Sequence, residues 1–177
     1  DLDGVISQHS SASRVKWLRN DGSANFTAVD VGSTSYNSFK SNIADIDGDG
    51  DLDIAGIDLN SARVVWHENN GQSSPSFSDN TISLTGGARS IYDVELADMD
   101  GDGDTDMIVS SYSDSKVFLL LNNGASDPSF SQTVIDNSSG AFQLHIADIE
   151  KDGDKDIFLS AFSAKTLTMI KNTGPTM

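Results

Sequence analysis

One short acidic pattern occurs three times in the chain and constrains its fold more than any other feature. In each copy, five acidic residues stand at alternate positions of a nine-residue run that also contains glycine. The copies are Asp45–Asp53, Asp98–Asp106 and Asp148–Asp156, and Asp1–Asp3 matches the end of a fourth. Carboxylates this close repel one another strongly unless a cation lies among them. Hard oxygen ligands spaced along a glycine-bent loop suit calcium.

The composition argues against several other classes of function. The formal net charge is −16, but most of the acids lie in the acidic runs, so the charge is concentrated at sites. The 11 lysines and arginines form no patch, and we expect neither a nucleic-acid partner nor binding to an anionic membrane surface. No segment is apolar enough for membrane insertion. The chain has no cysteine, which excludes disulfides and thiolate metal sites.

The acidic runs do not fit an EF-hand, which is the rival type of calcium loop. An EF-hand places a bidentate Glu at position 12 of its loop, between two helices. Position 12 is Gly56, Val109 or Leu159 here, and no segment shows a helical apolar period. Three copies in register between apolar segments also argue against solvated acidic turns. We expect the calcium to be structural, because four carboxylates around an ion leave little room for a substrate.

The similarity between the copies extends over units of about 50 residues. Downstream of each acidic run lies an apolar-rich segment that ends in a turn with Asn and Gly, or with Asp and Gly. One position in this segment, five residues before the turn glycine in all four copies, holds a large apolar side chain: Trp17, Trp66, Leu119 or Met169. The two tryptophans could stack on sugars, but their shared position in a repeating strand favours packing between blades. A phenylalanine follows the first three turns, at Phe26, Phe77 and Phe130.

Each unit therefore predicts four short strands joined by turns. The first strand ends at the alanine before the acids (Ala44, Ala97 or Ala147), and the second follows the acidic run. The third carries the large apolar position, and the fourth begins near the common phenylalanine. Four antiparallel strands in every unit of this length are typical of a propeller blade. We predict an all-β fold, a β-propeller of four-stranded antiparallel blades.

By this count the chain is a single propeller fragment of about three and a half blades. Residues 35–86 and 87–138 are expected to form whole blades, and residues 1–34 and 139–177 partial ones. A propeller needs at least about four blades to close, so we expect completion by missing sequence or by other chains. Open blade edges are expected to favour self-association.

The repeat resembles the FG-GAP/VCBS type, which is found in integrin α-subunit propellers and in many secreted bacterial proteins. The resemblance covers essentially the whole chain. Its most specific part is the pattern Asp-x-Asp-Gly-Asp-Gly-x-x-Asp between two apolar strands, and the ending Trp-x-x-Asn-Asp/Asn-Gly also matches. In such families the acidic loop joins the innermost strand of a blade to the second and holds one calcium ion.

Carried over to this sequence, the resemblance implies that each loop uses four acidic side chains and one backbone carbonyl as ligands. The first site would use the side chains of Asp45, Asp47, Asp49 and Asp53 with the carbonyl of Asp51. The second would use Asp98, Asp100, Asp102 and Asp106 with the carbonyl of Asp104. The third would use Asp148, Glu150, Asp152 and Asp156 with the carbonyl of Asp154. We therefore expect about three Ca²⁺ ions.

The third site departs from the pattern and is expected to be the weakest. Glu150 replaces an aspartate, and its longer side chain changes the geometry of the loop. Lys151 and Lys155 reduce the negative potential around the ion.

The rim opposite the acidic loops is the expected ligand-binding face, because its loops vary between copies while the acidic rim does not. The candidates for ligand contacts there are Tyr36, Arg89, Tyr112 and Asp114. The ligand is expected to be a protein or a glycan.

The sequence thus predicts a calcium-stabilised extracellular propeller for recognition or adhesion, secreted or at the cell surface, because loops of this type fill at extracellular calcium levels. Two alternatives stay open. In the first, the chain is the propeller domain of a secreted polysaccharide-active enzyme, of the lyase or dehydratase type. In the second, it is a purely structural scaffold. No catalytic residue is assigned, since no nucleophile elbow or convergent set of catalytic groups is visible.

Overall fold

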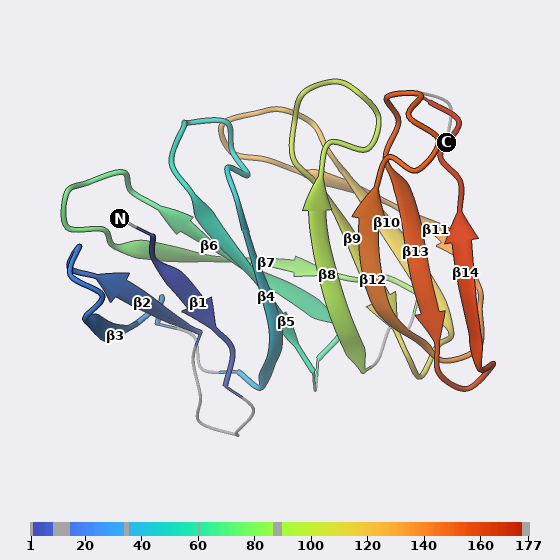
Figure 1. The fold of residues 1–177 in the computed structure, drawn as a ribbon, viewed down its shortest axis with the longest axis horizontal. Coiled ribbons are helices and arrows are strands. Elements are labelled where there is room, and N and C mark those ends of the chain that lie inside the picture. Colours follow the sequence, from blue (N-terminus) through green and yellow to red (C-terminus); the bar gives the residue numbers. More distant parts are fainter. Residues whose placement is uncertain (1, 9–14, 34–35, 60, 87–89, 175–177) are drawn as a thin grey trace.

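The computed structural model describes residues 2–8, 15–33, 36–59, 61–86 and 90–174. Within these ranges the regular secondary structure consists of β-strands alone. The fourteen strands pair in antiparallel fashion into four separate sheets (Figure 1). The predicted all-β architecture of antiparallel, propeller-like sheets is confirmed.

The strands follow one another through the sheets in chain order. The first sheet consists of β1 (Gly4–Ile6), β2 (Lys16–Asn20) and β3 (Phe26–Asp30), and the second of β4 (Ser38–Ala44), β5 (Asp53–Asp58), β6 (Arg63–Asn69) and β7 (Phe77–Ser83). The third sheet consists of β8 (Ile91–Ala97), β9 (Asp106–Ser111), β10 (Lys116–Asn122) and β11 (Phe130–Asp136). The fourth consists of β12 (Ala141–Ala147), β13 (Asp156–Ala161) and β14 (Thr166–Ile170).

Local sequence explains where these strands begin and end. The second strands of the two four-stranded sheets, β5 and β9, are buried along their whole length and are rich in β-branched and apolar residues. The turns after β6 and β10 end at Gly71 and Gly124, whose φ angles of 63° and 64° favour glycine. The predicted strand ends at Ala44, Ala97 and Ala147 coincide with the ends of β4, β8 and β12.

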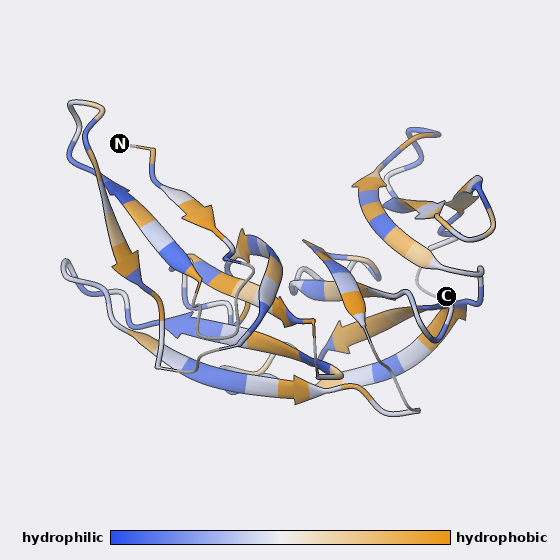
Figure 2. Ribbon diagram, turned by 90° about the horizontal axis from the view of Figure 1, so that it is seen from below, coloured by the Kyte–Doolittle hydropathy of each residue, from blue (hydrophilic) through white to orange (hydrophobic). Residues whose placement is uncertain are grey.

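The four sheets lie side by side around a common axis. Strands β1, β4, β8 and β12 lie next to one another in that order, so each sheet has one strand on the inside of the row. Seen from below, the sheets follow a curve, with the first and fourth sheets at its two ends (Figure 2). In each four-stranded sheet, the connection between the first and second strands therefore lies on one rim. The beginning of the first strand lies on the opposite rim.

The hydrophobic core lies between successive sheets. Trp66, which is 3% exposed, belongs to the cluster that joins the second sheet to the third, together with Phe118 and Leu120. Trp17 packs edge to face against Phe77, with ring centroids 6.4 Å apart, between the first and second sheets. Full burial of a large apolar side chain contributes about 1.5–3 kcal/mol, and the partly buried Trp17 and Phe77 contribute less. The shared large apolar position therefore serves packing between sheets in both tryptophans.

Candidate calcium-binding loops

The three acidic runs form the hairpin loops from β4 to β5, from β8 to β9 and from β12 to β13, all on the same rim. Gly48 and Gly50 have φ angles of 75° and 95°, and Gly101 and Gly103 have 81° and 95°. L-residues with a side chain rarely adopt such angles, so these glycines let the first two loops curl around a centre.

The first acid of each of these two loops holds the curl in place. The Asp45 carboxylate accepts hydrogen bonds from the backbone N–H groups of Gly48 at 2.8 Å and Gly50 at 3.0 Å. Asp98 accepts the same pair from Gly101 at 2.7 Å and Gly103 at 3.0 Å. The two loops therefore share one backbone conformation, set by the same residue types at the same positions.

Side chains of the first two loops converge closely enough to share a metal ion. Oxygens of Asp45, Asp47 and Asp49 lie within 4.8 Å of one another, and so do oxygens of Asp98, Asp100 and Asp106. Burial, and after it the charge of the neighbouring acid in the loop, raises the pKa of Asp47 and of Asp100. A bound divalent cation reverses this effect, because it favours the charged carboxylates. All-oxygen ligands in a flexible loop fit calcium.

The last acid of each run has a second task, which is to bind the backbone. Asp53 is fully buried, and its two oxygens accept hydrogen bonds from the N–H groups of Ile46 at 3.0 Å and Asn69 at 2.8 Å. Asp106 and Asp156 repeat this pair of bonds in the other loops. Burial raises the pKa of Asp53 and of Asp106 to about 6. These acids tie the loop to the start of the next hairpin turn.

The acid at position seven points away from the cluster. A Cβ on Gly71 would lie 1.8 Å from an oxygen of the Asp51 carboxylate, and one on Gly124 would lie 2.0 Å from an oxygen of Asp104. These side chains thus rest against the neighbouring turn. The carboxylates of position seven therefore lie outside the convergent groups.

The third loop differs from the first two in four ways. Lys151 takes a φ of 60°, where the other loops have glycine. Glu150 forms an ion pair with Lys171, and one buried oxygen of Asp148 has no hydrogen-bond partner. Among the described residues, the acids of this loop do not form a convergent group of three as those of the first two loops do.

The structure also assigns a role to asparagines that the sequence reasoning treated only as turn residues. The Nδ2 of Asn122 donates hydrogen bonds to the carbonyls of Ile46 at 2.8 Å and Thr105 at 3.1 Å. Asn172 donates to the carbonyl of Met99 at 2.7 Å. Each of these side chains therefore fastens the acidic loop of the preceding sheet. Their constant place, 16 residues after the last acid of the run, is the signal that points to them.

The candidates on the opposite rim lie in different environments. Tyr112 follows β9 and is partly exposed, and Asp114 accepts a hydrogen bond from the Ser111 hydroxyl at 2.8 Å. Arg89 lies outside the described residues. Tyr36 is only 4% exposed and belongs to the core between the first and second sheets.

Tyr36 takes part in a buried polar network. Its hydroxyl lies 2.8 Å from Nε2 of His67, and Nδ1 of this histidine lies 2.6 Å from the Asp79 carboxylate. Asp79 also accepts hydrogen bonds from the backbone N–H and the hydroxyl of Ser33. Burial lowers the pKa of His67, although Asp79 opposes this. The network ties the connection before β4 to the outer strands of the second sheet.

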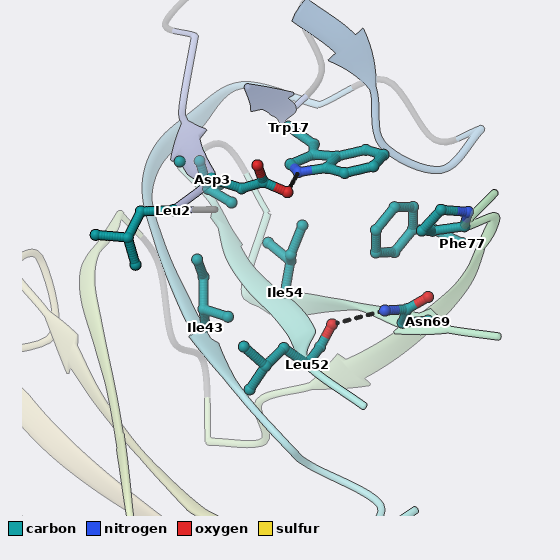
Figure 3. A pocket seen from close by; sticks show the side chains of 11 residues that line it. Leu2, Asp3, Trp17, Ile43, Leu52, Ile54, Asn69 and Phe77 are labelled. Atoms are coloured by element: carbon teal, nitrogen blue, oxygen red, sulfur yellow. Dashed lines mark hydrogen bonds between the residues drawn. The ribbon is translucent and has the colours of Figure 1, made fainter. Parts of the chain in front are cut away.

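A mainly apolar pocket of about 340 Å³ lies between the first and second sheets (Figure 3). Trp17 donates a hydrogen bond to the Asp3 carboxylate at 2.8 Å, and Asn69 donates one to the carbonyl of Leu52 at 3.1 Å. The backbone N–H of Asn20 binds Asp3 as well. The polar groups drawn here are thus used within the protein, and the pocket shows no arrangement of catalytic groups.

The chain matches a protein-family model. The model of the FG-GAP-like repeat matches three overlapping segments, residues 1–56, 45–109 and 98–159. Each matched segment contains at least one of the acidic runs or its remnant. No curated protein matches the chain.

Among solved structures, the chain is similar to a lectin of Agrocybe aegerita, described in a study of its specific recognition of non-reducing terminal N-acetylglucosamine. The TM-score is 0.54 and the sequence identity is 21%. The match covers 90% of this chain and 47% of that one, so the chain spans about half the length of the lectin. This likeness supports the fold. Among the described residues, no helix has the length and apolar character needed to cross a membrane.

Proposed function

Because this chain belongs to the FG-GAP-like repeat family, we propose that it is a calcium-stabilised β-propeller module for recognition. It binds a protein or glycan ligand through the rim opposite the acidic loops. The observation that carries the proposal is that three carboxylates converge within 4.8 Å in each of the first two loops, from positions one, three and five of the first run and positions one, three and nine of the second. Such a group needs a cation to offset its repulsion.

In this proposal the ions are structural. The ligands of each ion are the four acidic side chains expected for its loop and one backbone carbonyl. This carbonyl belongs to Asp51, Asp104 or Asp154. The third loop binds calcium most weakly, because Lys151 and the ion pair of Glu150 with Lys171 disfavour the geometry of the first two. Occupied loops stabilise the hairpins between the first and second strands of the second, third and fourth sheets.

The placement of the module follows from its calcium requirement. Calcium at extracellular levels fills loops of moderate affinity, so we place the protein outside the cell or at its surface. Residues 35–86 and 87–138 act as whole blades, and 1–34 and 139–177 as partial blades. Partial blades leave open edges, which pair with further blades or with other copies.

Binding and catalysis are separated by one experiment. The protein, with calcium, is applied to an array of glycans and extracellular proteins, and the same polysaccharides are screened for cleavage. Recognition predicts binding that is lost when EGTA removes the calcium, with no change in the polysaccharides. Cleavage of a polysaccharide would favour the enzymatic alternative. Calcium-bound, folded protein that binds nothing on the array would favour a scaffold.

A further inference from the structure

Five aromatic side chains form a continuous row on the rim opposite the acidic loops, and we propose that this row is the stacking surface for a glycan. The row consists of Phe39, Tyr92, Tyr112, Phe142 and Phe162. The inference rests on the proposed recognition function, and it narrows the ligand class and places the contacts.

The row arises from the repeat itself. Phe39, Tyr92 and Phe142 are the second residues of β4, β8 and β12. These three strands are the inner strands of successive sheets and lie side by side. Tyr112 and Phe162 directly follow β9 and β13, which pair with β8 and β12. Equivalent positions of successive sheets thus bring five rings from distant parts of the chain to one place.

The rings touch one another without interruption. Phe39 and Tyr92 have centroids 5.5 Å apart, and Tyr92 and Phe142 have centroids 4.9 Å apart. Phe142 and Phe162 are separated by 6.1 Å, and Tyr112 lies 5.5 Å from Tyr92 and 6.3 Å from Phe162. Aromatic pairs at these distances attract one another, so the row is a single preformed surface.

Both ends of the row are exposed to solvent. Phe39 is 45% exposed and Phe162 is 69% exposed, while the rings between them are partly buried. None of the five belongs to the hydrophobic clusters that join the sheets. Contiguous apolar surface of this kind on a soluble protein marks an interaction site.

Hydrogen-bonding side chains lie directly beside the row. A cavity of about 450 Å³ is lined by Phe142 and Phe162 together with Gln143, Ser160, Lys165 and Thr166. A second cavity, of about 330 Å³, shares Gln143 and Ser160 with the first. It continues toward the inside of the sheets, where Lys40, Asp93, Glu95 and His145 line it.

The charged groups of the second cavity are held in fixed positions. Lys40 lies 3.0 Å from Asp93 and 3.0 Å from Glu95. Asp93 also accepts a hydrogen bond from the backbone N–H of Leu144 at 2.9 Å, and Glu95 accepts one from Asn42 at 2.9 Å. Oxygens and nitrogens fixed in this way are preorganised to meet the hydroxyl groups of a ligand.

This combination fits a sugar better than a protein side chain surface. A pyranose ring has an apolar face of C–H groups, which stacks on an aromatic ring, and a rim of hydroxyls, which seeks donors and acceptors. Pockets that orient small ligands have this composition, largely apolar with a few placed polar groups. The centre of a protein–protein interface is instead depleted of charged residues, and here four ionisable side chains line the adjoining cavity.

The test uses the double variant F39A/F162A, which removes the two most exposed rings of the row. The matched control is F26A, since Phe26 is 55% exposed and lies on β3, away from the row. The probes are an array of neutral and amino-sugar oligosaccharides and an array of extracellular proteins, both with calcium. Melting curves in calcium verify that every variant is folded.

The expected result is that wild-type protein and F26A bind the same oligosaccharide, while F39A/F162A binds it about tenfold or more weakly, the change expected from the loss of stacking contacts. A Y112F variant, which keeps the ring, retains binding. Oligosaccharide binding that F39A/F162A leaves unchanged would overturn this inference and leave the proposed function standing. Row-dependent binding to a protein, without any oligosaccharide, would overturn the glycan assignment. Folded protein that binds neither array would contradict both.

Discussion

A single carboxylate in this protein can belong to the proposed metal site and also accept hydrogen bonds from the backbone. Asp106 lies in the group of convergent acids of the second loop, and its two oxygens also accept the N–H groups of Met99 and Asn122, both at 2.8 Å. The alternation of acids in the sequence predicts the first role. It does not predict the second, because Asn122 reaches this side chain only after β9 and β10 have paired.

The substitution Asp106→Ala, measured with calcium and in EGTA, separates the two roles. It leaves two backbone donors without their acceptor, and each buried donor left unsatisfied costs about 1–3 kcal/mol. We expect a loss of about 3 kcal/mol in the free energy of unfolding, measured by urea titration. The loss persists in EGTA, because the backbone bonds do not need the ion. Asp127→Ala removes an exposed acid outside the loops and serves as the control. Equal stability of D106A and D127A in EGTA would refute the stabilising role of the hydrogen bonds from Asp106 to the backbone.

His67 makes stability depend on pH in the acidic range. Burial lowers its pKa in the folded protein, so the unfolded chain, with an ordinary pKa of about 6.5, takes up the proton first. The free energy of unfolding therefore falls as the pH drops below about 6.5 and continues to fall down to the folded pKa. Above that range His67 contributes no pH dependence.

The measurement compares the unfolding free energies of wild-type protein and H67Q at saturating calcium. The pH is varied from 7.5 to 5, a range that extends roughly one unit or more to either side of the ordinary pKa. The wild-type curve falls more steeply, since glutamine does not titrate. Parallel curves for wild type and H67Q would show that the network does not act as described.

At the scale of elements, the third loop is a natural variant of the first two. Lys151 holds a φ of 60°, and a side chain in the left-handed region costs roughly 1 kcal/mol or more. K151G is expected to raise the calcium affinity of this loop severalfold, because it relaxes the backbone and removes a positive charge. Calorimetric titration measures the change. K155A, which removes a nearby charge but no strain, gives a smaller gain. No gain in K151G would remove the strain argument.

The asparagine at the end of β10 couples neighbouring sheets. Asn122 is 6% exposed and binds the carbonyl of Ile46 in the loop of the preceding sheet. Asn122→Ala is expected to cost about 1–3 kcal/mol of stability and to weaken calcium binding in the first loop, although the residue belongs to the third sheet. Urea unfolding and calcium titration measure the two effects. Asn137→Ala, at an exposed position, changes neither. Calcium affinity unchanged in N122A would rule out the coupling.

The positions of the strands were predictable because apolar segments, turn glycines and acidic runs recur together, and one copy supports the reading of another. The Asn122 contact was not predictable, since it joins residues 76 positions apart. The burial of Tyr36 also escaped prediction. Its place in a variable connection suggested an exposed side chain, but its hydroxyl meets His67 inside the core. Contacts between sheets depend on how the sheets pack, which periodicity alone does not reveal.

At the scale of the molecule, the two rims have different tasks. The acidic rim repeats one loop with small changes. The opposite rim carries the aromatic row, which no single repeat unit contains and which forms only when the inner strands stand side by side. The central claim is that calcium in the acidic loops stabilises this arrangement.

Thermal unfolding in calcium and in EGTA, with magnesium as the control cation, tests that claim most directly. Each site at a calcium concentration of about a hundred times its dissociation constant adds about 2.7 kcal/mol to stability. We predict a markedly higher melting temperature in calcium than in EGTA, and a smaller effect of magnesium, which accommodates flexible loops poorly. Identical melting curves in calcium and EGTA would contradict the account.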